Sequence, residues 1–413
     1  MSGVDLLPLG EVVRPTRPRV TPVDYPGLPF IGMEHVEAHS MKLLGTVPAG
    51  TMKSSAVHFK PGDVLYGRLR PYLNKVYRPT FEGLCSAEFL VLPENERVDG
   101  AYLQYFLNSS AFVRYASHLN TGDRPRVDFD QLAPYEIPLP EVDEQRRIVA
   151  EIEKQFSRLY EGVANLKRIK SNLSRQKLAI FISATSGRLL AESAASSDDS
   201  GVGETQEDLP AGWRWAEIGE LAGVVRGGSP RPAGDPRYFG GPIPWITVGP
   251  ITADEDDYLR SVPTGLTEAG RERSRYIEPH TLLLTNSGAT LGVPKISLIG
   301  GCINDGVAAL LNIDYPLKKY LLIYLRSKTA EMRRVNQGAA QPNLNTTIIK
   351  QYRVPVPPTD EQQRIVAEVD RRLSIVREVE AEVDANLKRA QALRQAVLAR
   401  AFFGSNEAVT SSA

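Results

Sequence analysis

The sequence predicts an α+β protein in which two tandem mostly-β domains are separated by two long antiparallel helices, related as an internal repeat. The segment Tyr135–Ile152 recurs as Tyr352–Val369, 217 positions later, with eleven of eighteen residues identical. After each copy of Asp-Glu-Gln, apolar residues recur every 3 or 4 positions, which is typical of an amphipathic helix. Before each copy, short apolar runs alternate with Gly and Pro, which favours strands and turns.

The repeat extends well upstream of the helices. Cys85 and Cys302 are also 217 positions apart, and Leu28–Val36 is similar to Ile243–Ile251. Self-similarity over such a distance predicts two copies of one unit. The two cysteines are therefore expected at equivalent core positions and not in a disulfide.

Each helix carries one apolar stripe. The stripe residues expected to pair the helices are Ile148, Ile152, Phe156, Leu159, Val163 and Leu166 in the first, and Ile365, Val369, Leu373, Val376, Val383 and Leu387 in the second. A helix of this length spans about 65 Å, longer than a small domain, so it needs a partner helix. Antiparallel pairing under a pseudo-two-fold axis is the simplest solution; the alternative is that each stripe packs on its own domain.

The helix ends have recognisable signals. Thr359 and Gln362 have the spacing of a capping box, Asp143 is the candidate N-cap of the first helix, and Gly187 and Gly404 are candidate C-terminal caps. Shorter helices are expected at Ala101–Ser117 and Lys318–Val335. The predicted layout is a first domain at 1–140, a long helix at 141–187, a flexible linker at 188–210, a second domain at 211–357, a second long helix at 358–404 and a disordered tail at 405–413.

Composition sets limits on the functional class. Lys+Arg and Asp+Glu are both 49, so the whole chain has no net attraction for nucleic acid, and DNA contacts would have to be local. The start lacks the apolar stretch of a signal peptide, and no apolar run approaches the ~18 residues of a membrane span. With two cysteines and no disulfide framework, a reducing cytoplasm is the expected location.

Catalytic motifs are not found. The sequence has no Gly-rich phosphate loop, and the His35–His39 pair falls in a loop and strand, where it does not favour a metal. The carboxylates of Ala253–Arg260 suggest either a metal site or, as we expect, a solvated loop. The chain is therefore interpreted as a non-catalytic protein without a metal.

The duplicated layout and the repeated Glu-Gln helix start resemble the specificity subunits of type I restriction–modification systems. Gly212–Leu221, Thr285–Gly292 and Gly338–Asn345 also resemble stretches of that family. The resemblance implies two target recognition domains, each reading half of a split, asymmetric double-stranded DNA sequence. It implies that the helices set the spacing and dock two copies of a DNA adenine methyltransferase subunit, which binds S-adenosylmethionine. Motor and nuclease restriction subunits are possible further partners.

Candidate DNA contacts are side chains that suit phosphates or base edges. In the first domain they are Arg68, Arg70, Tyr72, Lys75, Arg124 and Arg126; in the second they are Arg226, Ser229, Arg231, Thr247, Asn286, Ser287, Thr290, Gln337, Gln341 and Asn343. Gly270–Tyr276 is a candidate phosphate-contacting strip. Salt bridges and turn chemistry are the alternative roles of these residues. The alternative for the whole chain is a scaffold that joins proteins without reading DNA, and an enzyme of unrecognised type is a more distant one.

Overall fold

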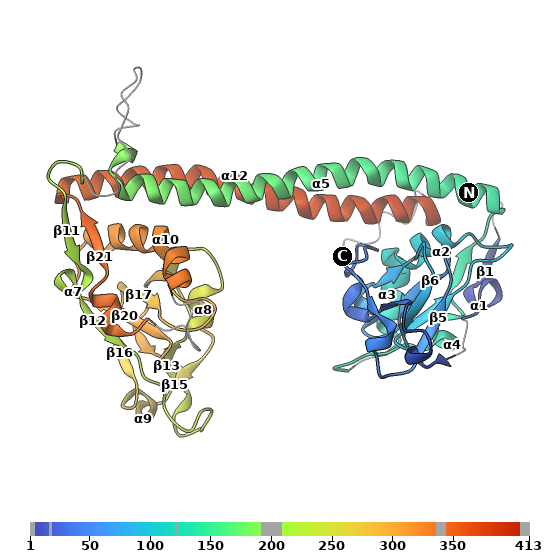
Figure 1. Ribbon diagram of the computed structural model, residues 1–413, viewed down its shortest axis with the longest axis horizontal. Helices are drawn as coiled ribbons and strands as arrows, with labels where there is room; N and C mark the ends of the chain where they lie inside the picture. Colours follow the sequence, from blue (N-terminus) through green and yellow to red (C-terminus); the bar gives the residue numbers. More distant parts are fainter. Residues whose placement is uncertain (1–4, 16–18, 121, 191–208, 336–343, 405–413) are drawn as a thin grey trace, which may run out of the picture. The chain divides into compact units, whose positions relative to one another are not determined.

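The computed structural model describes residues 5–15, 19–120, 122–190, 209–335 and 344–404. The chain divides into two compact units (Figure 1). The first unit takes residues 1–168 and 383–413, and the second takes residues 169–382. Each unit therefore contains a domain together with about half of each long helix. The predicted linker and tail fall largely on 191–208 and 405–413, which lie outside the described residues.

The domain of the first unit has three small sheets. A five-stranded sheet has the order β2-β5-β8-β3-β4, a three-stranded sheet the order β7-β6-β9, and β1 pairs with β10. The strands are β1 (Leu6–Pro8), β2 (Arg19–Val20), β3 (Pro29–Ile31), β4 (Val47–Pro48), β5 (Ala56–Phe59), β6 (Val64–Gly67), β7 (Val76–Tyr77), β8 (Gly83–Ser86), β9 (Phe89–Leu92) and β10 (Glu136–Pro138). The helices are α1 (Leu9–Val12), α2 (Gly100–Leu107), α3 (Ser110–His118) and α4 (Phe129–Leu132).

The domain of the second unit has the same kinds of sheet. A five-stranded sheet has the order β12-β20-β17-β18-β14, a four-stranded sheet the order β15-β13-β19-β16, and β11 pairs with β21. The strands are β11 (Arg214–Glu217), β12 (Gly223–Arg226), β13 (Phe239–Ile246), β14 (Tyr258–Leu259), β15 (Gly265–Leu266), β16 (Arg275–Ile277), β17 (Thr281–Thr285), β18 (Pro294–Ser297), β19 (Gly301–Ile303), β20 (Val307–Leu311) and β21 (Arg353–Val356). The helices are α7 (Ile218–Leu221), α8 (Val248–Thr252), α9 (Glu268–Arg271), α10 (Leu317–Val335) and α11 (Thr346–Lys350).

The two domains share an equivalent hydrogen bond between a helix and the strand before a long helix. We call the sheets and helices that the two domains have in common the frame. In the first, the buried Tyr102 hydroxyl donates to the carbonyl of Pro138 at 2.7 Å. In the second, the buried Tyr320 hydroxyl donates to the carbonyl of Pro355 at 2.6 Å. Each bond ties a helix to the strand that leads into a long helix, and a buried carbonyl needs such a partner.

Both cysteines are free and fully buried, as predicted. Cys85 lies on β8, which pairs in parallel with β3, and Cys302 lies on β19, which pairs in parallel with β13. Burial raises the pKa of both thiols. The two residues therefore occupy matching strands of the repeated frame.

The long helices are α5 (Val142–Thr185) and α12 (Thr359–Phe403). The sequences of their first turns are almost identical, and the glutamine in each makes an equivalent hydrogen bond. Gln145 Nε2 donates to the carbonyl of Pro140 at 2.8 Å, and Gln362 Nε2 donates to the carbonyl of Pro357 at the same distance. Each buried amide thus fastens the first helical turn to the extended Pro-rich lead-in.

Two predicted caps are wrong in detail. Thr359 and Asp143 are already inside their helices, because α12 begins at Thr359 and α5 at Val142. The first intrahelical bonds run to the carbonyls of Glu141 and Pro358. The predicted glycine caps are confirmed, since Gly187 and Gly404 have φ of +77° and +76°.

The predicted helix at Ala101–Ser117 is in fact two helices. α2 ends at Leu107, and α3 begins at Ser110 after the side chain of Ser109 accepts a hydrogen bond from the backbone of Phe112. Serine favours such N-caps because its short side chain reaches the unpaired backbone amides. The helix expected at Lys318–Val335 matches α10.

The helix stripes are largely removed from solvent. Ile152, Phe156, Ile365, Val369, Leu373, Val376 and Val383 are buried, while Ile148, Leu159, Val163, Leu166 and Leu387 are half-buried. Within the first unit, Phe156 of α5 packs both on Tyr105 of the domain and beneath the guanidinium of Arg394 on α12. Within the second unit, Lys177 of α5 forms an ion pair of 2.6 Å with Glu380 of α12. In this structure helix pairing and docking on the domain, treated above as alternatives, occur together.

Candidate nucleic-acid interface

In the first domain, the structure brings the two candidate basic segments together. The backbone amide of Arg70 donates to the carbonyl of Pro125 at 2.7 Å, and the amide of Val127 donates to the carbonyl of Arg68 at 3.0 Å. Leu69 and Arg126 form an isolated β-bridge. The loop after β6 and the loop before α4 therefore lie side by side.

Half of these side chains already have partners within the domain. Arg68 forms an ion pair with Asp128 and Arg126 with Glu88, and Lys75 Nζ donates to the carbonyl of Met33 at 2.6 Å. Burial is the main cause that lowers the pKa of Arg68. For these three the salt-bridge or turn role is the one seen, and neither Asp128 nor Glu88 was singled out from the sequence.

The remaining candidates of this domain are available to a ligand. Tyr72 is 45% exposed, and Arg124 is exposed with no carboxylate partner among the described residues. Arg70 has a left-handed backbone (φ +52°), and its buried Nε has no hydrogen-bond partner. An Arg in this strained conformation with an unsatisfied donor suits a site that a partner completes.

In the second domain, Asp305 contacts three of the candidate DNA-binding residues. Its carboxylate accepts a hydrogen bond from Ser229 Oγ at 2.5 Å and lies 3.9 Å from the guanidinium of Arg231, while its carbonyl accepts from Arg226 Nε at 2.8 Å. Asp305 had no local signal in the sequence, because these partners precede it by more than seventy residues. Asp305 thus organises the edge where β12 ends.

Further candidates meet at the same edge. The amide of Asn304 donates to the carbonyl of Ile246, the residue before Thr247, and the amide of Asn286 donates to the carbonyl of Gly306. A Cβ at Gly306 would lie 3.1 Å from Ser287 Oγ, so Ser287 faces this turn. We call the surface formed by Arg226, Ser229, Arg231, Thr247, Asn286, Ser287, Asn304 and Asp305 the strand-end rim.

Asn286 is the most unusual member of the rim. It is fully buried, and both polar atoms of its amide lack a hydrogen-bond partner within the described part of the chain. Its backbone carbonyl accepts from Leu344, which directly follows residues 336–343. Since a buried amide is normally satisfied, this group is a candidate for completion by a ligand or by water.

One described candidate, Thr290, is not part of the rim. The carbonyl of Thr290 accepts from Thr285 Oγ1, and Thr290 lines a cavity shared with Lys177 and Arg377 of the long helices. Gln337, Gln341 and Asn343 lie outside the described residues. The rim therefore contains the candidates from the strand ends but not the one that faces the helices.

The strip Gly270–Tyr276 adjoins the rim. Arg275 Nε donates to the carbonyl of Arg226 at 3.1 Å, and the guanidinium of Arg271 stacks on Tyr276 at 4.6 Å. Arg273 stacks on Tyr238 at 5.3 Å. Arg273 and Arg275 are exposed and have no carboxylate partner among the described residues, which suits contacts to phosphates.

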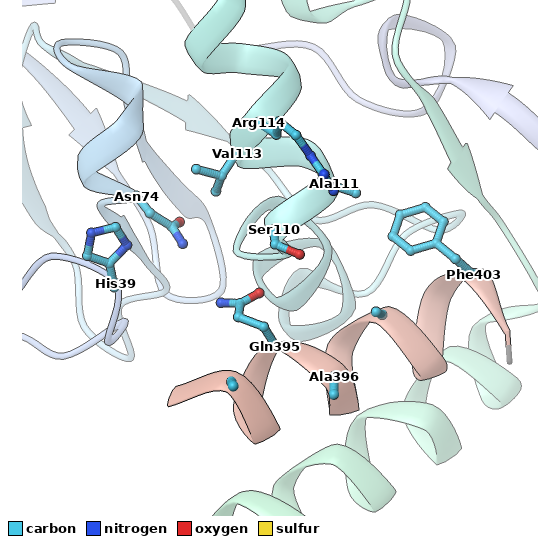
Figure 2. Close-up of a pocket in the computed structure, with 11 residues that line it drawn as sticks. His39, Asn74, Ser110, Ala111, Val113, Arg114, Gln395, Ala396 and Phe403 are labelled. Carbon is cyan, nitrogen blue, oxygen red and sulfur yellow. The ribbon is translucent and has the colours of Figure 1, made fainter. Parts of the chain in front are cut away.

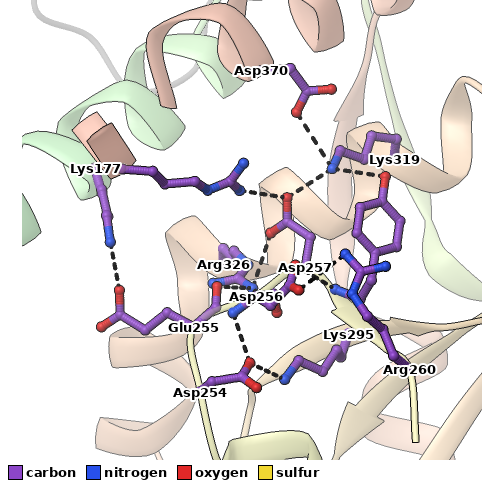
Figure 3. A network of polar contacts seen from close by, with 12 residues as sticks. Lys177, Asp254, Glu255, Asp256, Asp257, Arg260, Lys295, Lys319, Arg326 and Asp370 are labelled. Atoms are coloured by element: carbon purple, nitrogen blue, oxygen red, sulfur yellow. Dashed lines mark hydrogen bonds and ion pairs between the residues drawn. The ribbon is translucent and has the colours of Figure 1, made fainter. Parts of the chain in front are cut away.

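The prediction of a solvated loop for the carboxylates of Ala253–Arg260 holds for the exposed side chains of Asp254 and Glu255 and is wrong for Asp257, whose side chain is buried. Asp254, Glu255 and Asp256 pair with Lys295, Lys177 and Arg260, and the side chain of Asp257 is buried against Lys319 and Arg326 (Figure 3). Burial opposes ionisation of Asp257, but Arg326 and Lys319 outweigh it and lower its pKa. The sequence did not reveal this network because its cations lie elsewhere on α5, α10 and β18.

A groove of the first unit lies beside the end of α12 (Figure 2). It has a volume of 580 Å³ and is lined by His39, Asn74 and Ser110 on one side and by Gln395, Ala396 and Phe403 on the other. Burial, followed by the charge of Arg394, lowers the pKa of His39. No carboxylate or cysteine stands among its lining residues to pair with this imidazole.

Neither a metal-binding cluster nor a membrane-spanning helix is present among the described residues. No group of three or more His, Cys, Asp or Glu side chains in the described ranges is placed to hold a metal ion. No helix in the same ranges is long and apolar enough to cross a membrane.

Comparison with known proteins identifies the second repeat directly. Residues 210–385 match the family model for the type I restriction modification DNA specificity domain. The chain is 30% identical over 190 residues to the type I restriction enzyme EcoDI specificity subunit of Escherichia coli, covering 45% of this chain and 42% of that protein. It is 29% identical over 160 residues to the MjaIX specificity subunit of Methanocaldococcus jannaschii, covering 38% and 37%. The chain thus spans about two fifths of the length of these relatives.

The fold as a whole is also known. A solved structure, described as the structural basis of complex assembly and conformational transition of the type I R-M system, superimposes with a TM-score of 0.72. It covers 97% of this chain and 98% of its own, at 24% identity, so it establishes a shared fold. The matches together support the recognition of the chain as a type I restriction–modification specificity subunit.

Proposed function

We propose that the chain is the DNA-recognition subunit of a type I restriction–modification complex, and that each domain reads one half of a split, asymmetric target. One observation carries the proposal. The two domains keep the same frame, fixed by Tyr102 and Tyr320, while their loops carry different chemistry: paired and free arginines in the first, and an Asn-, Ser- and Asp-rich rim in the second. Arginine suits guanine and phosphate, and asparagine suits adenine.

In this proposal the chain itself performs no catalysis and holds no cofactor. Its contribution is binding and orientation: Arg124 and Tyr72 of the first domain and the strand-end rim of the second contact double-stranded DNA. Methylation belongs to two DNA adenine methyltransferase subunits, which bind S-adenosylmethionine and extrude the target base. Motor and nuclease subunits join them for restriction, and the complex works in the cytoplasm.

The helices are proposed to space the readers and to dock the methyltransferase subunits. Large apolar side chains stay exposed along them, which supports docking, because a protein without partners rarely leaves such residues uncovered in a row. They are Tyr160, Ile169, Leu178 and Ile182 on α5 and Ile375, Val379 and Leu393 on α12.

The test is methylation mapping in a host that expresses the chain with its methyltransferase subunit. A split adenine-methylated motif is expected. Exchanging the second domain for that of another specificity subunit should change one half of the motif and leave the other half intact. Arg124→Ala is expected to weaken methylation of the first half only, with the ion-paired Arg126→Ala as the matched comparison.

A scaffold that joins proteins without reading DNA is the rival function, and the balanced charge of the chain favours it. It predicts that no methylated motif depends on the chain, although the methyltransferase still copurifies with it. That combination would reject DNA reading and retain docking.

A further inference from the structure

Asp257 lies where the second domain meets α12. The residue is 2% exposed and precedes β14. Its carboxylate is 2.8 Å from Lys319 Nζ and 3.0 Å from the guanidinium of Arg326, both on α10, and 3.3 Å from the guanidinium of Arg377 on α12. One buried carboxylate thus joins the domain to a long helix.

The loop around Asp257 also reaches α5. Glu255 Oε2 is 2.8 Å from Lys177 Nζ of α5, and Lys177 in turn pairs with Glu380 of α12. Lys319 pairs a second time with Asp370 of α12, at 3.5 Å. Figure 3 shows Glu255, Lys177, Lys319 and Asp370 converging from the loop, from α5, from α10 and from α12.

The loop is rigid enough to transmit these contacts. Lys295 of β18, itself 1% exposed, pairs with Asp254 at 2.6 Å. The guanidinium of Arg326 donates to the carbonyls of Glu255 and Asp256 at 3.0 and 2.9 Å. Charge-assisted bonds of this kind fix direction as well as distance, whereas apolar burial is non-directional.

We propose that Asp257 is a positioning residue: its network fixes the angle at which the second domain stands on the helix pair, and with it the number of unread base pairs between the two half-targets. This inference rests on the proposed reading of a split target. Neither Asp257 nor its partners belong to the strand-end rim, so the network acts on where the second reader stands and not on which bases it prefers.

The experiment uses the complex of the full chain with its methyltransferase subunit. Its affinity is measured for a duplex that carries the mapped split target and for duplexes with one base pair added to or removed from the unread spacer. Asp257→Asn removes the charge at nearly constant shape. Asp256→Asn is the matched control, because Asp256 is the neighbouring residue and its carboxylate contacts the exposed Arg260 and the backbone amide of Tyr258, both close by in the chain.

The wild-type and Asp256→Asn complexes should reject the altered spacers, by about tenfold or more. Asp257→Asn should lose most of that discrimination while its base preference within each half-target stays unchanged. Asp257→Glu, which keeps the charge, should recover part of the discrimination. A merely structural role would lower the affinity for all spacers equally and leave the discrimination intact.

Retention of wild-type spacer discrimination by a folded Asp257→Asn complex would overturn the inference and leave the proposed function standing. If that variant does not fold, Arg377→Gln decides by the same criterion, since the Arg377 side chain is half-exposed. A wild-type complex that binds no split target would instead refute the proposed function, and the inference with it.

Discussion

The two units have the same frame, but an aromatic cluster is prominent where the first domain meets the long helices and an ion-pair network where the second does. In the first unit the contact is aromatic: Phe402 of α12 packs on Tyr102 and Phe106 at 5.1 and 5.5 Å, within a core that also takes in Phe156 of α5. In the second unit the contact is ionic, through Asp257 and Lys177. The frame bonds of a duplicated fold can therefore stay constant while the surfaces that orient each copy diverge.

The constant bonds are those that a helix start requires. Gln145 and Gln362 each donate to the carbonyl of a proline in the segment before the helix. Only Gln145 is fully satisfied, since its Oε1 accepts from the amide of Asp99 and its Nε2 also donates to the carbonyl of Arg97. The Oε1 of Gln362 is buried without a partner.

The largest effect is expected from cutting the chain between Ala191 and Asp208. Each unit contains helix segments from both halves of the chain, so the two fragments should still associate at micromolar concentration, and each alone should lose cooperative unfolding. Size-exclusion chromatography with circular dichroism measures both properties. Fragments that stay apart at that concentration would contradict the antiparallel pairing.

The next largest effect is expected for Phe402→Ala, which removes a buried aromatic ring from the core of the first unit. The loss should be about 3–5 kcal/mol of unfolding free energy for that unit. The three tryptophans, Trp213, Trp215 and Trp245, all lie in the second unit, so their fluorescence transition should not move while circular dichroism shows an earlier one. Leu393→Ala, at an exposed position of the same helix, is the control and should change stability by less than about 0.5 kcal/mol.

A smaller difference in unfolding free energy is expected between substitutions of the two repeated glutamines. Gln145→Ala should cost about 2–3 kcal/mol, because it removes three hydrogen bonds and leaves buried groups unpaired, whereas Gln362→Ala should cost about 1 kcal/mol. Chemical denaturation of the two variants provides the comparison. Equal losses would mean that the extra bonds of Gln145 contribute nothing net.

The smallest effect is the response to acid. Asp254 and Glu255 have pKa values lowered by hydrogen bonds from Lys295 and Lys177, and Asp257 has a lowered pKa as well. Carboxyls with lowered folded pKa values contribute stability that is complete above their unfolded pKa of about 4 and is lost as the pH falls through the folded values. The tryptophan-detected urea midpoint should therefore be flat from pH 7 to about 5 and fall below about pH 4. Asp257→Asn should reduce that fall.

Much of the fold followed from local sequence, and the site followed only in part. The spacing of apolar residues and the internal repeat predicted the bounds of α5 and α12 within a few residues, because an apolar stripe is a local signal. The rim candidates were chosen for side chains that suit base edges, and their role as DNA contacts stays a prediction. Asp257 and Asp305 were not, because their partners lie 62 to 120 and about 76 residues away in the chain. Charge alone does not distinguish a buried network from a solvated loop until the fold brings the cations in.

Hydrogen exchange of amides in two matched variants tests the contrast between the units most directly. Asp257→Asn should speed exchange in α10 and in the first half of α12, and leave α2, α3 and the end of α12 unchanged. Phe402→Ala should do the reverse. Exchange in the second unit that is unaffected by Asp257→Asn, or loosening of both units by either substitution, would contradict the claim that one frame is oriented by two different chemistries.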